Sequence, residues 1–204
     1  MIYAEYINLA NRTEPPYAPI RERLAFTHPD PDLVRGLHAS MGLATEAAEL
    51  AESWMNADRR FSRLDKVHFI EELGDICWYE AILGSMFPDH DLMEDLLVVE
   101  TSRSKRGRIT ELILEITNHA GRITDQFKRA IFYDACLDLT KILDSRQNIT
   151  EHVRELGHLL DVSLTYIREV NIAKLRKRFP EGFSEGDAVN RDLPTERKTL
   201  EGRS

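Results

Sequence analysis

The chain has 204 residues, of which 42% are hydrophobic and 30% charged, as in a typical globular protein. Its formal net charge of −8 argues against a broad nucleic-acid surface, because phosphate backbones are held by clustered Lys and Arg. No apolar run approaches the roughly 20 residues that span a bilayer. The N-terminal residues do not resemble a secretory signal, so the protein is expected in the cytoplasm.

Apolar residues recur with a helical period along most of the chain, without the sustained alternation of a half-buried strand. The sequence therefore predicts an all-α fold, an antiparallel helical bundle. Five prolines in PPYAPI and HPDPD are expected to separate a short N-terminal helix from the main domain. We predict an N-terminal segment 1–31, a helical domain 32–180, and a partly flexible C-terminal segment 181–204.

Helix periodicity and breaker residues give the expected elements of the main domain. An N-cap at Ser62 is expected to start the second helix, and the residues after Phe179 are rich in turn formers. Cys77 and Cys136 are expected to be buried thiols. The predicted helices run from Leu33 to Ala57, from Ser62 to Met86, from Leu92 to Val99, from Ile109 to Ile131, and from Thr150 to Arg178.

The chain also contains an internal repeat. Residues 66–83 can be laid over residues 149–167, so that Glu72 falls on Glu155 and Asp75 on His158. A weaker match places Glu46 on Glu115. We therefore predict a catalytic half, 32–100, and a degenerate half, 107–180, with chance similarity between amphipathic helices as the alternative.

Two pairs of acidic residues carry the candidate chemistry. Glu46 and Glu49 are three residues apart and share a helix face, and Glu72 and Asp75 repeat this spacing on the next helix. An antiparallel hairpin would bring these four carboxylates together. Such a set suits Mg²⁺, with Mn²⁺ as a substitute, and Glu71 is a candidate general base or further ligand. The alternative is that each pair lies on a solvated helix face.

The sequence HASMGLATEAAEL, followed by KVHFIEELGDICWY, resembles the MazG-like all-α nucleoside triphosphate pyrophosphatase superfamily, whose signature is ExxE, a spacer and ExxD. The segment 171–192 resembles a C-terminal signature of phage and bacterial members. The resemblance implies hydrolysis of a nucleoside triphosphate, expected to be a deoxynucleotide, to the monophosphate and pyrophosphate, through metal-activated water attacking the α phosphorus. It also implies that the four carboxylates bind the metal, and that the chain forms a homo-oligomer, most simply a dimer. A phage-encoded chain would act in the host cytoplasm.

Six further residues are candidates for substrate binding. Lys174 and Arg178 share a helix face and supply cations for phosphate, although a basic helix end that complements the helix dipole is the alternative. An aromatic pair beside the second acidic motif can stack on a base or belong to the core. The six are Lys66, Trp78, Tyr79, Asn171, Lys174 and Arg178, of which Asn171, Lys174 and Arg178 are implied by the resemblance.

Two other functions are compatible with parts of the pattern. Glu155 and His158 form an ExxH pair of the kind that binds iron in ferritin-like bundles, which also need a second such pair. A catalytically silent relative would act as a helical nucleotide sensor. The sequence does not identify the base, because pocket contacts determine specificity.

Overall fold

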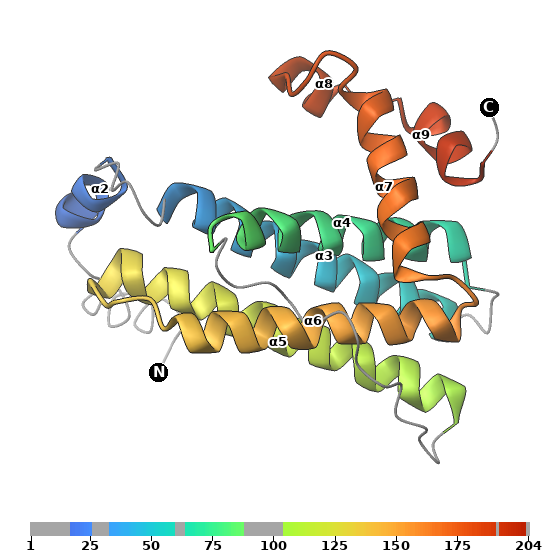
Figure 1. Ribbon diagram of the computed structural model, residues 1–204, viewed down its shortest axis with the longest axis horizontal. Helices are drawn as coiled ribbons and strands as arrows, with labels where there is room; N and C mark the ends of the chain where they lie inside the picture. The colour runs from blue at the N-terminus through green and yellow to red at the C-terminus, as the bar shows by residue number, and fades with distance from the viewer. Residues whose placement is uncertain (1–16, 26–32, 60–63, 88–103, 191, 203–204) are drawn as a thin grey trace, which may run out of the picture.

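The computed structural model describes residues 17–25, 33–59, 64–87, 104–190 and 192–202 (Figure 1). The described residues form eight helices and no strand, which confirms the predicted all-α class. None of these helices is both long and apolar enough to cross a bilayer. The helices are α2 (Tyr17–Ala25), α3 (Leu33–Arg59), α4 (Lys66–Ser85), α5 (Lys105–Tyr133), α6 (Leu139–Leu159), α7 (Leu164–Arg178), α8 (Glu185–Val189) and α9 (Leu193–Leu200).

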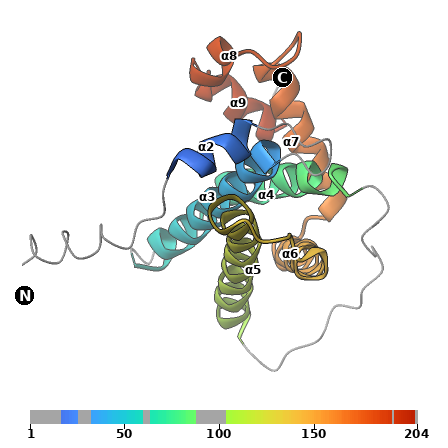
Figure 2. The ribbon, with the colours of Figure 1, turned by 90° about the vertical axis from the view of Figure 1, so that its left-hand side faces the viewer.

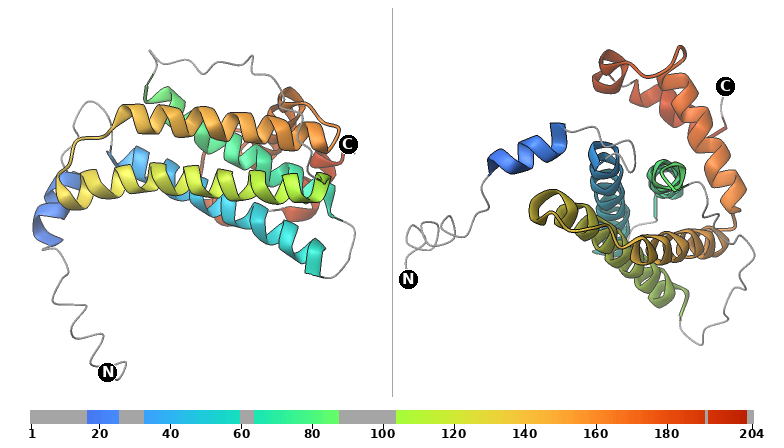
Figure 3. Two further views of the ribbon diagram at one scale, coloured as in Figure 1. Left: turned by 90° about the horizontal axis from the view of Figure 1, so that it is seen from below. Right: turned by 60° about the vertical axis from the view of Figure 1, so that its left-hand side comes forward.

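Two antiparallel hairpins form the body of the molecule. Helices α3 and α4 make the first hairpin and α5 and α6 the second, and α3 also packs closely on α5 (Figures 1 and 3). α4 ends and α5 begins at opposite ends of this bundle. The chain after α6 turns away, so that α7 crosses the bundle steeply and packs on α4, with α9 against both (Figure 2).

Short polar side chains start the helices locally, and apolar stripes assemble them. Asp65, Ser104, Asp138 and Ser163 each accept a hydrogen bond from a backbone N–H of the first helical turn, which satisfies an otherwise unpaired donor. The stripes meet in one core, where burial of each large side chain contributes about 1.5–3 kcal/mol. Its fully buried members include Leu43, Leu50, Phe69, Leu73, Leu112, Ile116, Ile123 and Phe127.

A close contact between α3 and α4 depends on a glycine. A Cβ atom at Gly42 would overlap the ring of Tyr79, which packs against the core from α4. The missing side chain at residue 42 therefore makes room for this ring between the two helices.

A buried ion pair joins the two hairpins. The Nε atom of Arg146 on α6 donates to Oε1 of Glu80 on α4 at 2.9 Å, and Nη2 lies 2.7 Å from the same oxygen. Both residues are buried, and Nη1 of Arg146 has no hydrogen-bond partner. The pair therefore fixes how α4 and α6 meet more than it adds net stability.

Replacing Arg146 by Leu should lower the free energy of unfolding by about 3–5 kcal/mol, because it leaves the Glu80 carboxylate buried and unpaired. The double variant Glu80→Met/Arg146→Leu should recover most of this loss in urea unfolding. Asp125→Asn, which breaks an exposed ion pair with Lys128, should change little and serves as the control. A double variant as unstable as the single one would contradict the prediction.

The prediction of one helix from Thr150 to Arg178 is wrong in two respects. Helix α6 already begins at Leu139, and a turn at residues 160–163 separates it from α7. Asp161 adopts a left-handed conformation, with φ of 60°, and Ser163 caps the next helix. A polar residue that tolerates this conformation, followed by an N-cap, is the turn signal that the periodicity concealed.

Several other boundaries also differ. Pro19 does not interrupt a helix but lies in the first turn of α2, where proline is tolerated because the lost N–H has no intrahelical acceptor. The helix predicted from Ile109 to Ile131 is longer, since α5 begins at Lys105 and ends at Tyr133. The second helix begins after Asp65, while the predicted N-cap Ser62, the predicted helix from Leu92 to Val99 and the N-terminal helix lie outside the described residues.

The C-terminal segment and the two cysteines pack in different ways, and the prediction for Cys136 is wrong. The C-terminal segment forms α8 and α9, and Leu200 of α9 is buried, because α9 packs on α7 and α4. Cys77 packs against the core, where burial raises the pKa of its thiol to about 12. Cys136 is not a buried thiol but is exposed in the connection between α5 and α6.

Candidate metal centre

The first hairpin brings three of the four predicted carboxylates together. Glu46 and Glu49 on α3 and Glu72 on α4 each offer an oxygen within 4.8 Å of the other two. The antiparallel pairing of α3 and α4 produces this convergence, because the two motifs lie at the same level of the hairpin. The three residues form the carboxylate cluster.

The carboxylate cluster is electrostatically unfavourable without a cation. Glu72 is only 3% exposed, and its Oε2 atom is buried without a hydrogen-bond partner. Burial, together with the neighbouring carboxylates, raises the pKa of Glu72 to about 9 and that of Glu46 to about 7. An unpaired buried oxygen among carboxylates fits the oxygen-ligand chemistry of Mg²⁺.

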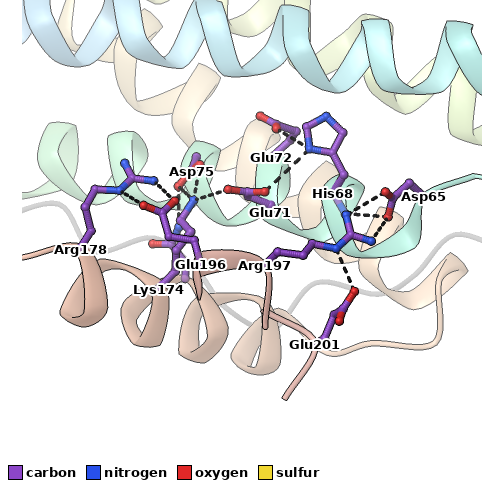
Figure 4. Close-up of polar contacts among 11 residues, drawn as sticks. Asp65, His68, Glu71, Glu72, Asp75, Lys174, Arg178, Glu196, Arg197 and Glu201 are labelled. Carbon is purple, nitrogen blue, oxygen red and sulfur yellow. Dashed lines mark hydrogen bonds and ion pairs between the residues drawn. The ribbon is translucent and has the colours of Figure 1, made fainter. Parts of the chain in front are cut away.

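Asp75 lies next to the cluster but has other partners (Figure 4). Lys174 of α7 donates to both oxygens of Asp75, at 2.8 and 2.6 Å, and Asn171 donates to Oδ1 at 2.7 Å. A Cβ atom at Gly74 would lie 2.9 Å from that of Asn171, so the glycine permits this close approach of α7. The predicted metal ligand Asp75 is therefore brought to the edge of the site and neutralised by a lysine that is itself fully buried.

A second set of potential ligands adjoins the cluster. His68, Glu71 and Glu72 offer ligand atoms within 4.8 Å of one another, and His68 Nδ1 lies 3.2 Å from Glu72 Oε1. Glu71 also accepts a hydrogen bond from Lys174 at 3.2 Å, and it raises the pKa of His68. The sequence analysis missed His68, although its spacing of three and four residues from the two glutamates places it on their helix face.

The remaining predicted phosphate contacts lie further out. Arg178 makes a two-pronged ion pair with Glu196 of α9, at 2.8 and 2.6 Å (Figure 4). Arg197, also on α9, pairs with the capping residue Asp65. Lys66 is exposed at the first position of α4. Phosphate binding by Lys66, Lys174 and Arg178 stays a prediction.

An aromatic group borders the cluster on the other side. Trp78 and Tyr79 meet edge to face at 4.7 Å between ring centroids, and the His38 ring of α3 lies 5.7 Å from Tyr79. Burial, then the charges of Glu46, Asp75 and Glu49, raises the pKa of Tyr79, which shows that its hydroxyl lies in the field of these acids. Tyr79 also belongs to the core packing, so both predicted roles of the pair remain open.

The second hairpin pairs two helices as the first does, but it carries other side chains at the aligned positions, and the duplication stays a prediction. Glu155, the counterpart of Glu72, accepts two hydrogen bonds of 2.6 Å from Arg108, and His158 is exposed. The ExxH pair of a ferritin-like site is therefore not available as a ligand pair. Glu115 instead lies near His119 and His152.

Comparison with protein-family models, with curated proteins and with solved structures finds no match to this chain. Membership of the MazG-like superfamily therefore stays a prediction from the motifs.

Replacing Glu72 by Gln should raise the melting temperature of the protein in EDTA, because the amide removes one charge from the carboxylate cluster. The raised pKa means that the folded protein holds a proton more tightly than the unfolded chain. The wild type therefore loses stability as the pH rises from about 5 to about 9, and the gain from Glu72→Gln should grow over this range.

Thermal unfolding followed by circular dichroism measures both effects. Mg²⁺ should stabilise the wild type but not Glu72→Gln. Glu169→Gln, at an exposed residue of α7, is the matched control. If Glu72→Gln lowered the melting temperature in EDTA at pH 8, the carboxylate would be a stabilising group and the cluster would not need a cation.

Proposed function

We propose that the chain is a Mg²⁺-dependent nucleoside triphosphate pyrophosphohydrolase, with its site on the first hairpin. The convergence of Glu46, Glu49 and Glu72 on one locus, with a buried and unpartnered Glu72 oxygen, carries the proposal. Carboxylates held this closely on packed helices have a divalent cation as their natural counter-charge.

The proposed reaction adds water to the α phosphorus of the substrate and breaks its bond to the α–β bridging oxygen. The bonding electron pair leaves with pyrophosphate, and the water gives up a proton. Bound Mg²⁺ would neutralise phosphate charge and lower the pKa of water. Glu46, Glu49 and Glu72 would hold it, with Asp75 next to them.

Glu71 is the proposed proton acceptor. Its carboxylate is half-buried and touches both His68 and Lys174, so its position is fixed by partners on both sides. Lys174 balances the charges of Glu71 and Asp75 while the triphosphate is absent. A group positioned by packed neighbours needs little reorganisation when substrate arrives.

The nucleotide part of the substrate is proposed from two observations. Tyr79, which meets Trp78 edge to face, lies near Glu46, Asp75 and Glu49, where a base can stack on the aromatic pair. The motifs themselves resemble those of MazG-like pyrophosphatases. A deoxynucleotide, acted on by a homodimeric protein, is the form of the substrate and of the enzyme that this resemblance favours.

The first test is pyrophosphate release from a panel of ribo- and deoxynucleoside triphosphates, with Mg²⁺ and then with EDTA. Release from one or two nucleotides, lost in EDTA and partly restored by Mn²⁺, is the expected result. Release of inorganic phosphate instead would contradict attack at the α phosphorus. Binding without turnover would identify a nucleotide sensor and overturn the enzymatic proposal.

Replacing Glu49 or Asp75 by Ala should abolish turnover. The exposed Glu49 can be replaced while the chain stays folded. Asp75→Ala leaves the buried Lys174 with Glu71 as its partner, so that variant is compared only where its circular dichroism spectrum matches the wild type. The kcat on the preferred nucleotide should fall by at least about 100-fold, the scale of losing a group that stabilises the transition state. Glu169→Ala on α7 should retain wild-type kcat. Retained turnover in either active-site variant, with an unchanged circular dichroism spectrum, would refute the site assignment.

A further inference from the structure

The second hairpin carries its own group of metal-ligating side chains. Glu115 and His119 are four residues apart on α5 and share a face, and His152 faces them from α6. Each residue offers a ligand atom within 4.8 Å of the other two. We call these three residues the histidine cluster.

An unpartnered buried nitrogen points to a missing ligand in this cluster. His119 is only 6% exposed, and its Nδ1 atom is buried without a hydrogen-bond partner. A buried imidazole nitrogen normally has a partner, because leaving it unpaired costs about 1–3 kcal/mol. The ring centroids of His119 and His152 are 6.0 Å apart, with the ring planes tilted by 52°.

The ligand chemistry selects the class of metal. Imidazole suits Zn²⁺ and its neighbours in the first transition row, whereas Mg²⁺ prefers oxygen ligands alone. Two histidines and one glutamate, with a fourth position left open, form a common ligand set of zinc sites. Two ligand atoms at about 2.1 Å from one ion are at most about 4.2 Å apart, so the cluster needs to contract only slightly to bind.

We propose that Glu115, His119 and His152 bind a zinc-class divalent ion that joins α5 to α6, at a site separate from the carboxylate cluster. The exposed Glu115 carboxylate marks the open side of this site, and His119 its buried side. The three protein ligands, one carboxylate and two neutral imidazoles, would carry a net charge of −1.

The protonation of the two imidazoles is compatible with metal binding. Burial lowers the pKa of both His119 and His152, so both rings are neutral at pH 7, the form that binds metal. Arg122 and Arg108 act in the same direction as burial on these rings.

Cobalt binding to the full-length, metal-stripped protein tests the proposal, since Co²⁺ replaces Zn²⁺ and gives visible absorption in low-coordinate sites. His68→Ala is the background, because it removes the imidazole of the first hairpin. We expect one equivalent of Co²⁺ that gives strong visible absorption and is displaced by Zn²⁺ but not by Mg²⁺, whereas Co²⁺ at the carboxylate cluster is displaced by Mg²⁺ and absorbs weakly. In this background His152→Ala and His119→Gln should each weaken binding at least tenfold.

Two controls make the outcome specific. His158→Ala removes an exposed histidine of the same helix, and Glu72→Gln alters the carboxylate cluster, and both should retain full cobalt affinity. Absence of saturable Co²⁺ binding, or unchanged affinity in folded His152→Ala, would overturn the proposal. The cobalt affinity of His119→Gln is interpreted only if its circular dichroism spectrum matches the wild type. If it does not, His152→Ala alone decides the test, because His152 is only half-buried.

Discussion

Repulsion between the carboxylates of Glu46 and Glu72 is the constraint around which the first hairpin is organised. Packing α3 on α4 buries the core residues on either side, and the same packing forces the two acids into one poorly hydrated locus. The apolar contacts are fixed by the helix faces, so the hairpin cannot relieve this repulsion by shifting one helix along the other. A cation relieves it without disturbing the packing.

Ion pairs as well as apolar burial hold the C-terminal part of the chain to α4. Along α7 the buried side chains are Ile167, Asn171 and Lys174, so only one of the three is apolar. Lys174 pairs with Asp75 of α4, and Arg178 pairs with Glu196 of α9. Leu164 and Val170 of α7 pack partly buried against the core. Buried ion pairs add little net stability but penalise alternative dockings, so this contact orients α7 and α9. Apolar packing therefore holds the side of the site formed by α3 and α4, and ion pairs orient the side formed by α7.

The sequence was sufficient to predict the class, the first hairpin and the convergence of three acids. These features follow from the 3.6-residue period, which fixes helix faces, and from the short spacing of the two motifs. The break at Asp161 was not predictable from the same period, because the turn at residues 160–163 contains neither proline nor glycine. The Lys174–Asp75 pair joins residues 99 positions apart, and only the tertiary path of α7 shows that the lysine is buried.

The same limit applies to the histidine cluster. His119 and His152 lie in segments that the predicted repeat aligns with apolar residues of the first hairpin, and the two histidines are on different helices. Only the pairing of α5 with α6 brings them together with Glu115.

The contact between Gly42 and Tyr79 links two positions that are far apart in the sequence. A side chain at residue 42 needs the space that the tyrosine ring fills, so neither position can vary freely while the other is kept. In an evolving lineage, enlargement at residue 42 would have to be preceded by a smaller residue at 79. Residue 79 also borders the carboxylates. A substitution at residue 42, which is not a site residue, would therefore be accompanied by a change in a residue that borders the site.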